Sequence, residues 1–293
     1  MKQILSLDIG NTRLKVNLWE PDAVSPSIYS RQDKSIQSLF ESDMPTESDT
    51  QSVLQKIKSI APEEITCVLS QVGAIERYTP SQSSQDEAEI IEWIKKKNIK
   101  TISIDQFFKN NYFFEMPVHY EKTLGIDRII AAHSVFEKCH SSRQKDSLSF
   151  VIDFGSYITV DAVSKRGFLG GHILPGKKAW AHSYEQGHQL APLVPKINKE
   201  LQKFTEYQDY DWPQNSVAAM SKAYGLAMTS FVLDLTQQHS PKRVFITGGD
   251  GESFYQALKK RFKIGQESSS IELIHSPLLV QRHLRDLANV CQY

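Results

Sequence analysis

The sequence predicts an α/β protein whose two domains repeat one design. Residues 7–15 carry an apolar run followed by Asp-x-Gly-Asn, and residues 152–161 repeat this order with Asp-x-Gly-Ser. The rest of the chain alternates short apolar runs with amphipathic stretches, which is typical of strands and helices around a partly parallel sheet. A chain of 293 residues can hold two domains of ordinary size, and we expect them at 1–118 and 119–293.

The elements follow from apolar periodicity and turn residues. Strands are expected where short apolar runs end at turn residues, and helices where apolar residues recur every three or four positions. In the first part of the chain, the expected elements are strands at 2–7 and 13–19, a helix at 51–60, a strand at 65–70, a helix at 87–97 and a strand at 100–104. An irregular connection is expected at 110–122. After it, the expected elements are a helix at 129–136, a strand pair within 149–168, a helix at 215–238, a strand at 244–246, and helices at 252–262 and 278–288. Asn215 or Ser216 should cap the long helix, and Pro277 should lie in the first turn of the last one.

The first Asp-x-Gly turn is a predicted phosphate-binding site. Gly10 allows a tight turn and a close approach of the backbone to a ligand, and free N–H groups in such a turn bind anions. Asp8 repels phosphate, so it should act through Mg2+ or water. An ordinary hairpin with a solvated Lys15 is the alternative. The predicted ATP-binding residues of this turn are Asp8, Ile9, Gly10, Asn11, Thr12, Arg13, Leu14 and Lys15.

Four further motifs follow in order along the chain. They are Gly-Ile-Asp-Arg at 125–128, Asp-Phe-Gly-Ser at 153–156, Gly-Gly-His-Ile-Leu-Pro-Gly at 170–176 and Thr-Gly-Gly-Asp at 247–250. With these motifs the chain resembles the type III pantothenate kinases over nearly its whole length. The resemblance implies the duplicated, ribonuclease H-like fold of actin, hexokinase and Hsp70, with two domains around an ATP cleft. It also implies ATP-dependent phosphorylation of pantothenate to 4'-phosphopantothenate, the first step of coenzyme A biosynthesis.

Asp127 is the predicted catalytic base. A primary alcohol must lose its proton as it attacks the γ-phosphate, and a positioned carboxylate is the usual acceptor in kinases. Arg128 offers a planar fork that suits the carboxylate of pantothenate. Spacing alone favours an Asp that caps a helix beside a solvated Arg, and the resemblance reverses this in favour of catalysis. By the same resemblance, Tyr120, Gly125 and Ile126 join Asp127 and Arg128 as substrate-binding residues.

The second Asp-x-Gly turn carries residues that the resemblance assigns to nucleotide and ion. Ser156 would contact ATP, and Asp153 would hold a monovalent cation, K+ or NH4+. His188 stands where the family has a Thr that reaches the acceptor, often that of the neighbouring subunit. As a lone residue, His188 also fits a partly exposed loop.

Two other functions are alternatives to pantothenate kinase. A sugar or acetate-type kinase is disfavoured, because the chain lacks an extended sugar-binding segment and carries Gly-Ile-Asp-Arg. A regulatory or accessory protein that kept the fold and lost catalysis is the stronger rival, because Tyr157 replaces a small residue and His188 replaces a Thr of the family pattern.

Composition restricts the partners. Lys and Arg total 34, as do Asp and Glu, so no charge excess favours nucleic acid or a membrane surface. No apolar run approaches the ~20 residues that span a bilayer, and no signal-peptide pattern opens the chain. Three scattered cysteines fit reduced thiols better than disulfides or a zinc site. We therefore expect a cytoplasmic protein.

A homodimer is the last expectation. Trp180 and Tyr184 are four apart and would share one helical face. Such a stripe more often belongs to a core than to a partner surface. The resemblance favours the dimer, because in the family this helix delivers an acceptor contact to the neighbouring subunit.

Overall fold

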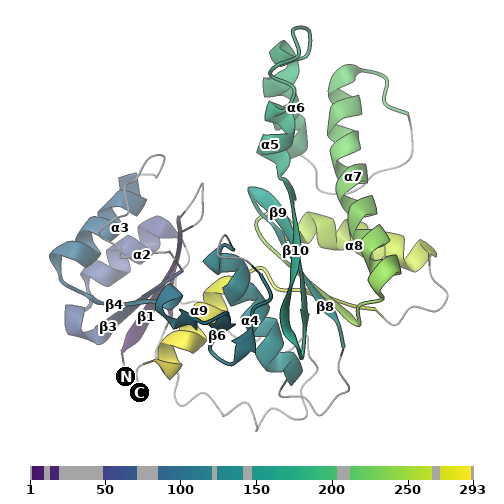
Figure 1. Ribbon diagram of the computed structural model, residues 1–293. Coiled ribbons are helices and arrows are strands. Elements are labelled where there is room, and N and C mark those ends of the chain that lie inside the picture. The colour runs from purple at the N-terminus through teal and green to yellow at the C-terminus, as the bar shows by residue number, and fades with distance from the viewer. Residues whose placement is uncertain are drawn as a thin grey trace. The chain divides into compact units, whose positions relative to one another are not determined.

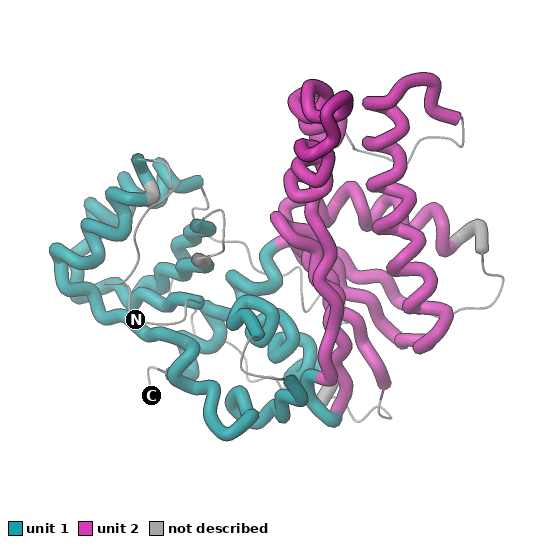
Figure 2. The backbone as a smooth tube through the Cα atoms, turned by 45° about the horizontal axis from the view of Figure 1, so that its top comes forward, with its two compact units in different colours: residues 1–143, 166–168, 278–293 teal, residues 144–165, 169–277 magenta. Residues whose placement is uncertain are grey.

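A four-stranded sheet and a five-stranded sheet organise the chain, each in its own unit (Figures 1 and 2). The computed structural model describes residues 2–9, 14–19, 49–70, 85–120, 124–140, 147–202, 212–265 and 271–291. Unit 1 comprises residues 1–143, 166–168 and 278–293, and unit 2 comprises residues 144–165 and 169–277. This division differs from the expected boundary at residue 118, because the last helix of the chain packs on the first sheet and the helix that begins at Ile126 packs on that last helix.

The sheet of unit 1 has the strand order β2-β1-β3-β4. Its strands are β1 (Gln3–Ile9), β2 (Leu14–Trp19), β3 (Ile65–Leu69) and β4 (Lys100–Ser103). β1 and β2 pair antiparallel, with Asp8 opposite Lys15, as the predicted hairpin requires. β3 runs parallel to both β1 and β4. The hairpin therefore lies at one side of the sheet and the parallel strands at the other.

Helices cover both faces of this sheet. The helices of unit 1 are α2 (Thr50–Lys58), α3 (Gln85–Lys96), α4 (Ile126–His140) and α9 (Leu279–Val290), with short 3-10 turns at Pro62–Glu64 and Ile104–Phe107. Leu5 and Leu7 of β1 belong to a buried cluster with α2 and α3. Ser6 and Asp8 point to the opposite face, because side chains alternate along a strand. There α9 packs on β1, β2 and β3, and α4 packs on α9.

Two expectations for unit 1 were wrong. The stretch expected to be irregular, 110–122, contains strands β6 (Tyr112–Phe113) and β7 (Met116–Pro117), which form a small sheet with the preceding β5 (Phe108–Lys109). Strands of two residues are too short to show an alternating pattern. Pro277 precedes the last helix, which begins at Leu279.

The sheet of unit 2 has the strand order β10-β9-β8-β11-β12. Its strands are β8 (Ser149–Phe154), β9 (Tyr157–Ser164), β10 (Gly167–Pro175), β11 (Arg243–Thr247) and β12 (Glu272–His275). β8 and β9 pair antiparallel, with Asp153 opposite Thr159, and β11 runs parallel to β8 and β12. This arrangement repeats that of unit 1, strand for strand, from the hairpin to the second parallel strand.

A helical layer buries one face of the second sheet. Its helices are α5 (Lys177–His182), α6 (Val194–Gln202), α7 (Ser216–His239) and α8 (Gly251–Gly265), with a 3-10 turn at Ala191–Leu193. Phe150, Ile152 and Phe154 of β8 share one core cluster with residues of all four helices. Asn215 caps α7 as expected, since its side-chain oxygen accepts a hydrogen bond from the Ala218 N–H at 2.9 Å. No helix in the described part of the chain is both long and apolar enough to cross a bilayer.

Candidate active site

Asp8 lies at the end of β1 in a ring of polar side chains. It is 5% exposed. Its Oδ1 accepts a hydrogen bond from the Ser70 hydroxyl at 2.7 Å, and its Oδ2 accepts one from the Gln281 amide at 3.1 Å. Lys15, on the paired strand, places its Nζ 3.5 Å from Oδ2 and remains half-exposed. The first hairpin therefore presents a held carboxylate beside a cation that can reach solvent.

Asp127 lies in the first turn of α4, near this carboxylate. Its Oδ1 accepts a hydrogen bond from the Arg128 N–H at 2.9 Å. Burial raises the pKa of Asp127, and the negative charge of Asp8 raises it further, while Lys15 and Arg128 oppose this shift. A carboxylate with a raised pKa binds a proton more readily, which suits a general base. The structure thus brings Asp127, Asp8 and Lys15 together within unit 1.

The Gly125 position keeps the carboxylate of Asp127 close to the backbone. A Cβ atom on Gly125 would lie 2.5 Å from Asp127 Oδ1. The adjoining Ile126 is 7% exposed and anchors the start of α4 in the core. Gly125 and Ile126 therefore shape the start of α4. This structural role is additional to their predicted contact with substrate.

Arg128 is held by aromatic rings. It is 6% exposed, and its guanidinium carbon lies 5.4 Å from the ring centre of Tyr120 and 5.9 Å from that of Phe168. The two rings meet edge to face. Such contacts fix the plane of a guanidinium and favour its charge. The structure places Tyr120 beside Arg128, and both are predicted substrate-binding residues, whereas Phe168 carried no signal in the sequence.

Asp153 occupies in unit 2 the position that Asp8 occupies in unit 1. Each is the penultimate residue of the first hairpin strand. A Cβ atom on Gly248 would collide with the Asp153 carboxylate and the Phe154 backbone, and one on Gly155 would lie 3.2 Å from Asp153 Oδ1. Gly248 has a φ of +93°, which glycine adopts readily. The Thr-Gly-Gly-Asp turn thus closes tightly over Asp153.

The Pro-Gly turn at 175–176 packs against the second hairpin turn. A Cβ atom on Gly176 would meet the carbonyl oxygens of Gly155 and Ser156. Just beyond, Lys177 Nζ lies 2.7 Å from Asp250 Oδ1, with both side chains largely buried. The Asp250 N–H donates to the Phe154 carbonyl at 3.0 Å. Three motifs that are distant in sequence therefore meet at the turn that contains Ser156.

His188 lies elsewhere in unit 2, on an exposed turn after α5. Trp180 and Tyr184, the proposed interface stripe, pack on their own chain. The Trp180 Nε1–H donates to the Met220 carbonyl at 3.0 Å, and the Trp180 ring lies 5.6 Å from that of Tyr224. The stripe belongs to the core, so this observation does not support a dimer.

Some predicted site residues cannot be placed, and others were missed. Gly10, Asn11, Thr12 and Arg13 fall outside the described residues. Ser70 and Gln281, which bind Asp8, were not predicted. Ser70 follows a parallel strand, where ligand-binding residues of α/β sheets gather, so it could have been found. Gln281 lies on a helix at the far end of the chain, and no local pattern links it to Asp8.

The residues around the two aspartates fit the implied ions. Carboxylate oxygens accept more than one hydrogen bond, so Asp8 retains capacity for the water shell that Mg2+ keeps. Beside Asp153, the carbonyl oxygens of Gly155 and Ser156 lie at the same turn, and oxygen donors suit a monovalent cation. The donor types therefore match Mg2+ at Asp8 and K+ or NH4+ at Asp153.

Comparison with a solved structure confirms the predicted fold. A Campylobacter jejuni protein, named as a Baf family transcriptional activator, matches with a TM-score of 0.52 and 19% identity over 98% of each chain. At this identity the likeness shows the fold alone. Together with the repeated hairpin and parallel strands, it confirms the actin-, hexokinase- and Hsp70-like fold class.

Comparisons of sequence place the chain in a family. The family model described as type III pantothenate kinase matches residues 4–238. A protein of that name from Campylobacter hominis is 31% identical over 153 residues, which are 52% of this chain and 64% of the relative. Another from Wolinella succinogenes is 33% identical over 131 residues, or 52% of its length. A third, from Flavobacterium johnsoniae, is 24% identical over 258 residues, or 87% of this chain and 89% of the relative. The chain belongs to the type III pantothenate kinase family.

Proposed function

We propose that this protein transfers the γ-phosphoryl group of ATP to the primary hydroxyl of pantothenate, giving 4'-phosphopantothenate and ADP. The observation that carries the proposal is the grouping of Asp127, Asp8 and Lys15 within unit 1. A base, a carboxylate suited to hydrated Mg2+ and a cation suited to phosphate are the parts that phosphoryl transfer needs.

Each residue has one task in this reaction. Asp127 takes the hydroxyl proton as the oxygen attacks the γ-phosphorus, and the ADP oxygen leaves from the opposite side. Lys15 offsets the charge of the phosphates, and Arg128 binds the carboxylate of pantothenate. Mg2+ near Asp8 would neutralise phosphate charge when bound. Ser156 remains the proposed ATP contact of unit 2, and Asp153 the proposed ligand of K+ or NH4+.

A regulatory protein without catalysis is the second candidate. The name of the Campylobacter jejuni structure suggests such a role for that protein. In this chain Tyr157 is 51% exposed beside the second hairpin turn, where the family has a small residue. ATP binding without turnover of pantothenate would favour this candidate.

The test is replacement of Asp127 by Asn, assayed by ADP release with ATP and pantothenate. Loss of a general base should lower kcat by about 10²–10⁴. The fold should survive, because burial and Asp8 already disfavour the charge that is removed. Asp234→Asn is the matched control. Asp234 is exposed on α7, and its side chain accepts a hydrogen bond from Gln238, 4 positions further along the same helix. A variant at 127 with kcat within a few-fold of wild type would exclude Asp127 as the base.

A further inference from the structure

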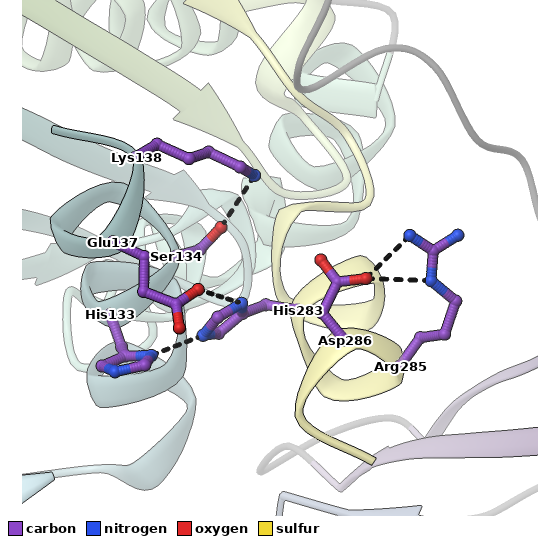
Figure 3. Close-up of polar contacts among 7 residues, drawn as sticks. All are labelled: His133, Ser134, Glu137, Lys138, His283, Arg285 and Asp286. Carbon is purple, nitrogen blue, oxygen red and sulfur yellow. Dashed lines mark hydrogen bonds and ion pairs between the residues drawn. The ribbon is translucent and has the colours of Figure 1, made fainter. Parts of the chain in front are cut away.

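Two histidines and one glutamate form a cluster between α4 and α9 in unit 1 (Figure 3). His133 and Glu137 are four positions apart on α4, and His283 faces them from α9. His133 Nδ1 and His283 Nε2 are 2.7 Å apart, so one proton is shared between them. One ligand atom from each of the three residues lies within 4.8 Å of the others.

The two histidines of the cluster are buried, and the glutamate is partly exposed. His133 and His283 are 2% and 1% exposed. The side chain of Glu137 is 35% exposed. His283 Nδ1 is buried and has no hydrogen-bond partner among the described residues, since Glu137 Oε2 lies 3.9 Å away.

The charge states of the two histidines suit a cation. Burial lowers the pKa of His133 to about 4. Burial, with the charges of His133 and Lys138, lowers the pKa of His283 well below its usual value. Both rings are therefore neutral near pH 7, which is the form that binds metals. Burial, followed by the charge of Asp286, raises the pKa of Glu137 to about 7, and Lys138 opposes this shift.

We propose that His133, Glu137 and His283 together bind one first-row transition-metal ion, for which Zn2+ is the best match. Two imidazole nitrogens and one carboxylate oxygen are a donor set of four-coordinate zinc, with water as the fourth ligand. Mg2+ and Ca2+ prefer sites made of oxygen alone.

Binding requires the three ligand atoms, which lie within 4.8 Å of one another, to adjust to separations of about 3.3 Å. The ion replaces the proton between the two rings and releases it to solvent. Zinc–nitrogen bonds of about 2.0–2.1 Å in tetrahedral geometry place two nitrogens about 3.3 Å apart, so the rings must separate by about 0.6 Å. Because the side chain of Glu137 is partly exposed, an ion can reach the site from solvent there.

The surroundings hold the rings and connect the site to the rest of unit 1. His133 packs on Phe113, with ring centres 5.1 Å apart, and on Phe114, at 5.4 Å. α4 also carries Asp127, and α9 also carries Gln281, which binds Asp8. A bound ion would therefore join the two helices that hold these carboxylates.

The test measures binding to metal-free, full-length protein. Co2+ serves as an optical probe, because four-coordinate Co2+ absorbs far more strongly than hydrated Co2+, and equilibrium dialysis measures Zn2+. Two variants remove a ligand. Glu137→Gln keeps the size of a half-exposed side chain, and His133→Phe places a ring among Phe113 and Phe114. His182→Ala is the matched control, because it removes an exposed histidine paired with Glu185 in unit 2.

The wild type should take up one Co2+ with the spectrum of a four-coordinate ion, and Zn2+ should displace it. Each ligand variant should weaken Zn2+ binding about tenfold or more, and His182→Ala should leave it unchanged. Circular dichroism checks that each variant is folded. The proposal is overturned if folded wild type gives no four-coordinate Co2+ spectrum, if Glu137→Gln binds Zn2+ as tightly as wild type, or if His182→Ala removes the binding.

Discussion

At the scale of single residues, burial raises the pKa of Asp127, and the charge of Asp8 raises it further. Asp127 is therefore ionised, and able to accept a proton, only above a pH higher than for an ordinary Asp. If Asp127 is the base, as we propose, the acid limb of kcat/KM reports this pKa. The proposal therefore predicts a pH dependence that responds to the charge of Asp8.

Replacing Asp8 by Asn should move the acid limb to lower pH. The substitution removes the neighbouring negative charge, which lowers the pKa of Asp127 and lets it ionise earlier. The position of the limb is read from the pH profile after normalising the rate, since loss of Asp8 also reduces the rate itself. Asp105→Asn, in another part of unit 1, is the control and should leave the limb in place. An acid limb that stays in place or moves to higher pH in Asp8→Asn would contradict the role proposed for Asp127.

Short motifs in the sequence singled out Asp8, Lys15 and Asp127, which lie near one another in unit 1. Their proposed roles follow from chemistry that a short motif displays, whereas the residues that support Asp8 carry no such signal. Ser70 and Gln281 hold Asp8 through hydrogen bonds from 62 and 273 positions away. Such contacts depend on which elements pack together, and single-sequence patterns do not contain that information.

At the scale of elements, both hairpins were predicted because alternation and an Asp-x-Gly turn act locally. In unit 2, glycines then let neighbouring turns approach the hairpin. Gly248 and Gly249 show how specific this requirement is, since only Gly248 has a positive φ and a crowded Cβ position.

Gly248→Ala should destabilise the protein by about 1–3 kcal/mol, because it adds backbone strain and a collision with Asp153. Gly249→Ala is a matched control, since a Cβ there meets nothing within 4 Å, and it should cost less than about 1 kcal/mol. Urea unfolding measures both. Equal losses for the two variants would show that the turn does not pack as described.

Cys67 gives the core of the first sheet a measurable pH dependence. It lies on β3 and is fully buried, and burial raises the pKa of its thiol to about 12, with a hydrogen bond to Thr101 opposing the shift. Because the folded pKa is above that of the unfolded thiol, this contribution to stability is complete below about pH 8.5 and is lost as pH rises toward 12.

The free energy of unfolding of the wild type should fall by about 2 kcal/mol more than that of Cys67→Val between pH 8 and 10. Valine is apolar like the neutral thiol, and its β-branched side chain suits a strand. Comparing the two proteins at each pH cancels groups that titrate in both. Parallel pH profiles would indicate that the thiol is not buried.

At the scale of the whole molecule, the chain builds two units from one pattern but not from two separate halves of the sequence. The order of a hairpin followed by parallel strands repeats, and this repeat was visible in the two Asp-x-Gly motifs. The assignment of the last helix to unit 1 was not visible, because it rests on packing between α9 and β1. A single boundary in the sequence cannot describe a unit to which the C-terminal segment of the chain also belongs.

We propose that two copies form a homodimer in which His188 serves the acceptor site of the neighbouring copy. The exposed position of His188 allows this role, and the family resemblance motivates it. Light scattering after size exclusion should give twice the mass of one chain. A monomer at micromolar concentration would end the proposal. If Asp127→Asn and His188→Ala are each inactive, mixing them should restore one working site per mixed dimer, and no recovery after verified exchange would place the site within one chain.

The proposed function requires pantothenate to accept a phosphoryl group on this protein. Mass spectrometry identifies the products after incubation with ATP, Mg2+, K+ and pantothenate, alongside an ADP count and an Asp127→Asn sample. The wild type should form one phosphorylated pantothenate for each ADP, and the variant should form almost none. Folded wild type that binds ATP but yields no phosphorylated pantothenate would exclude pantothenate kinase activity.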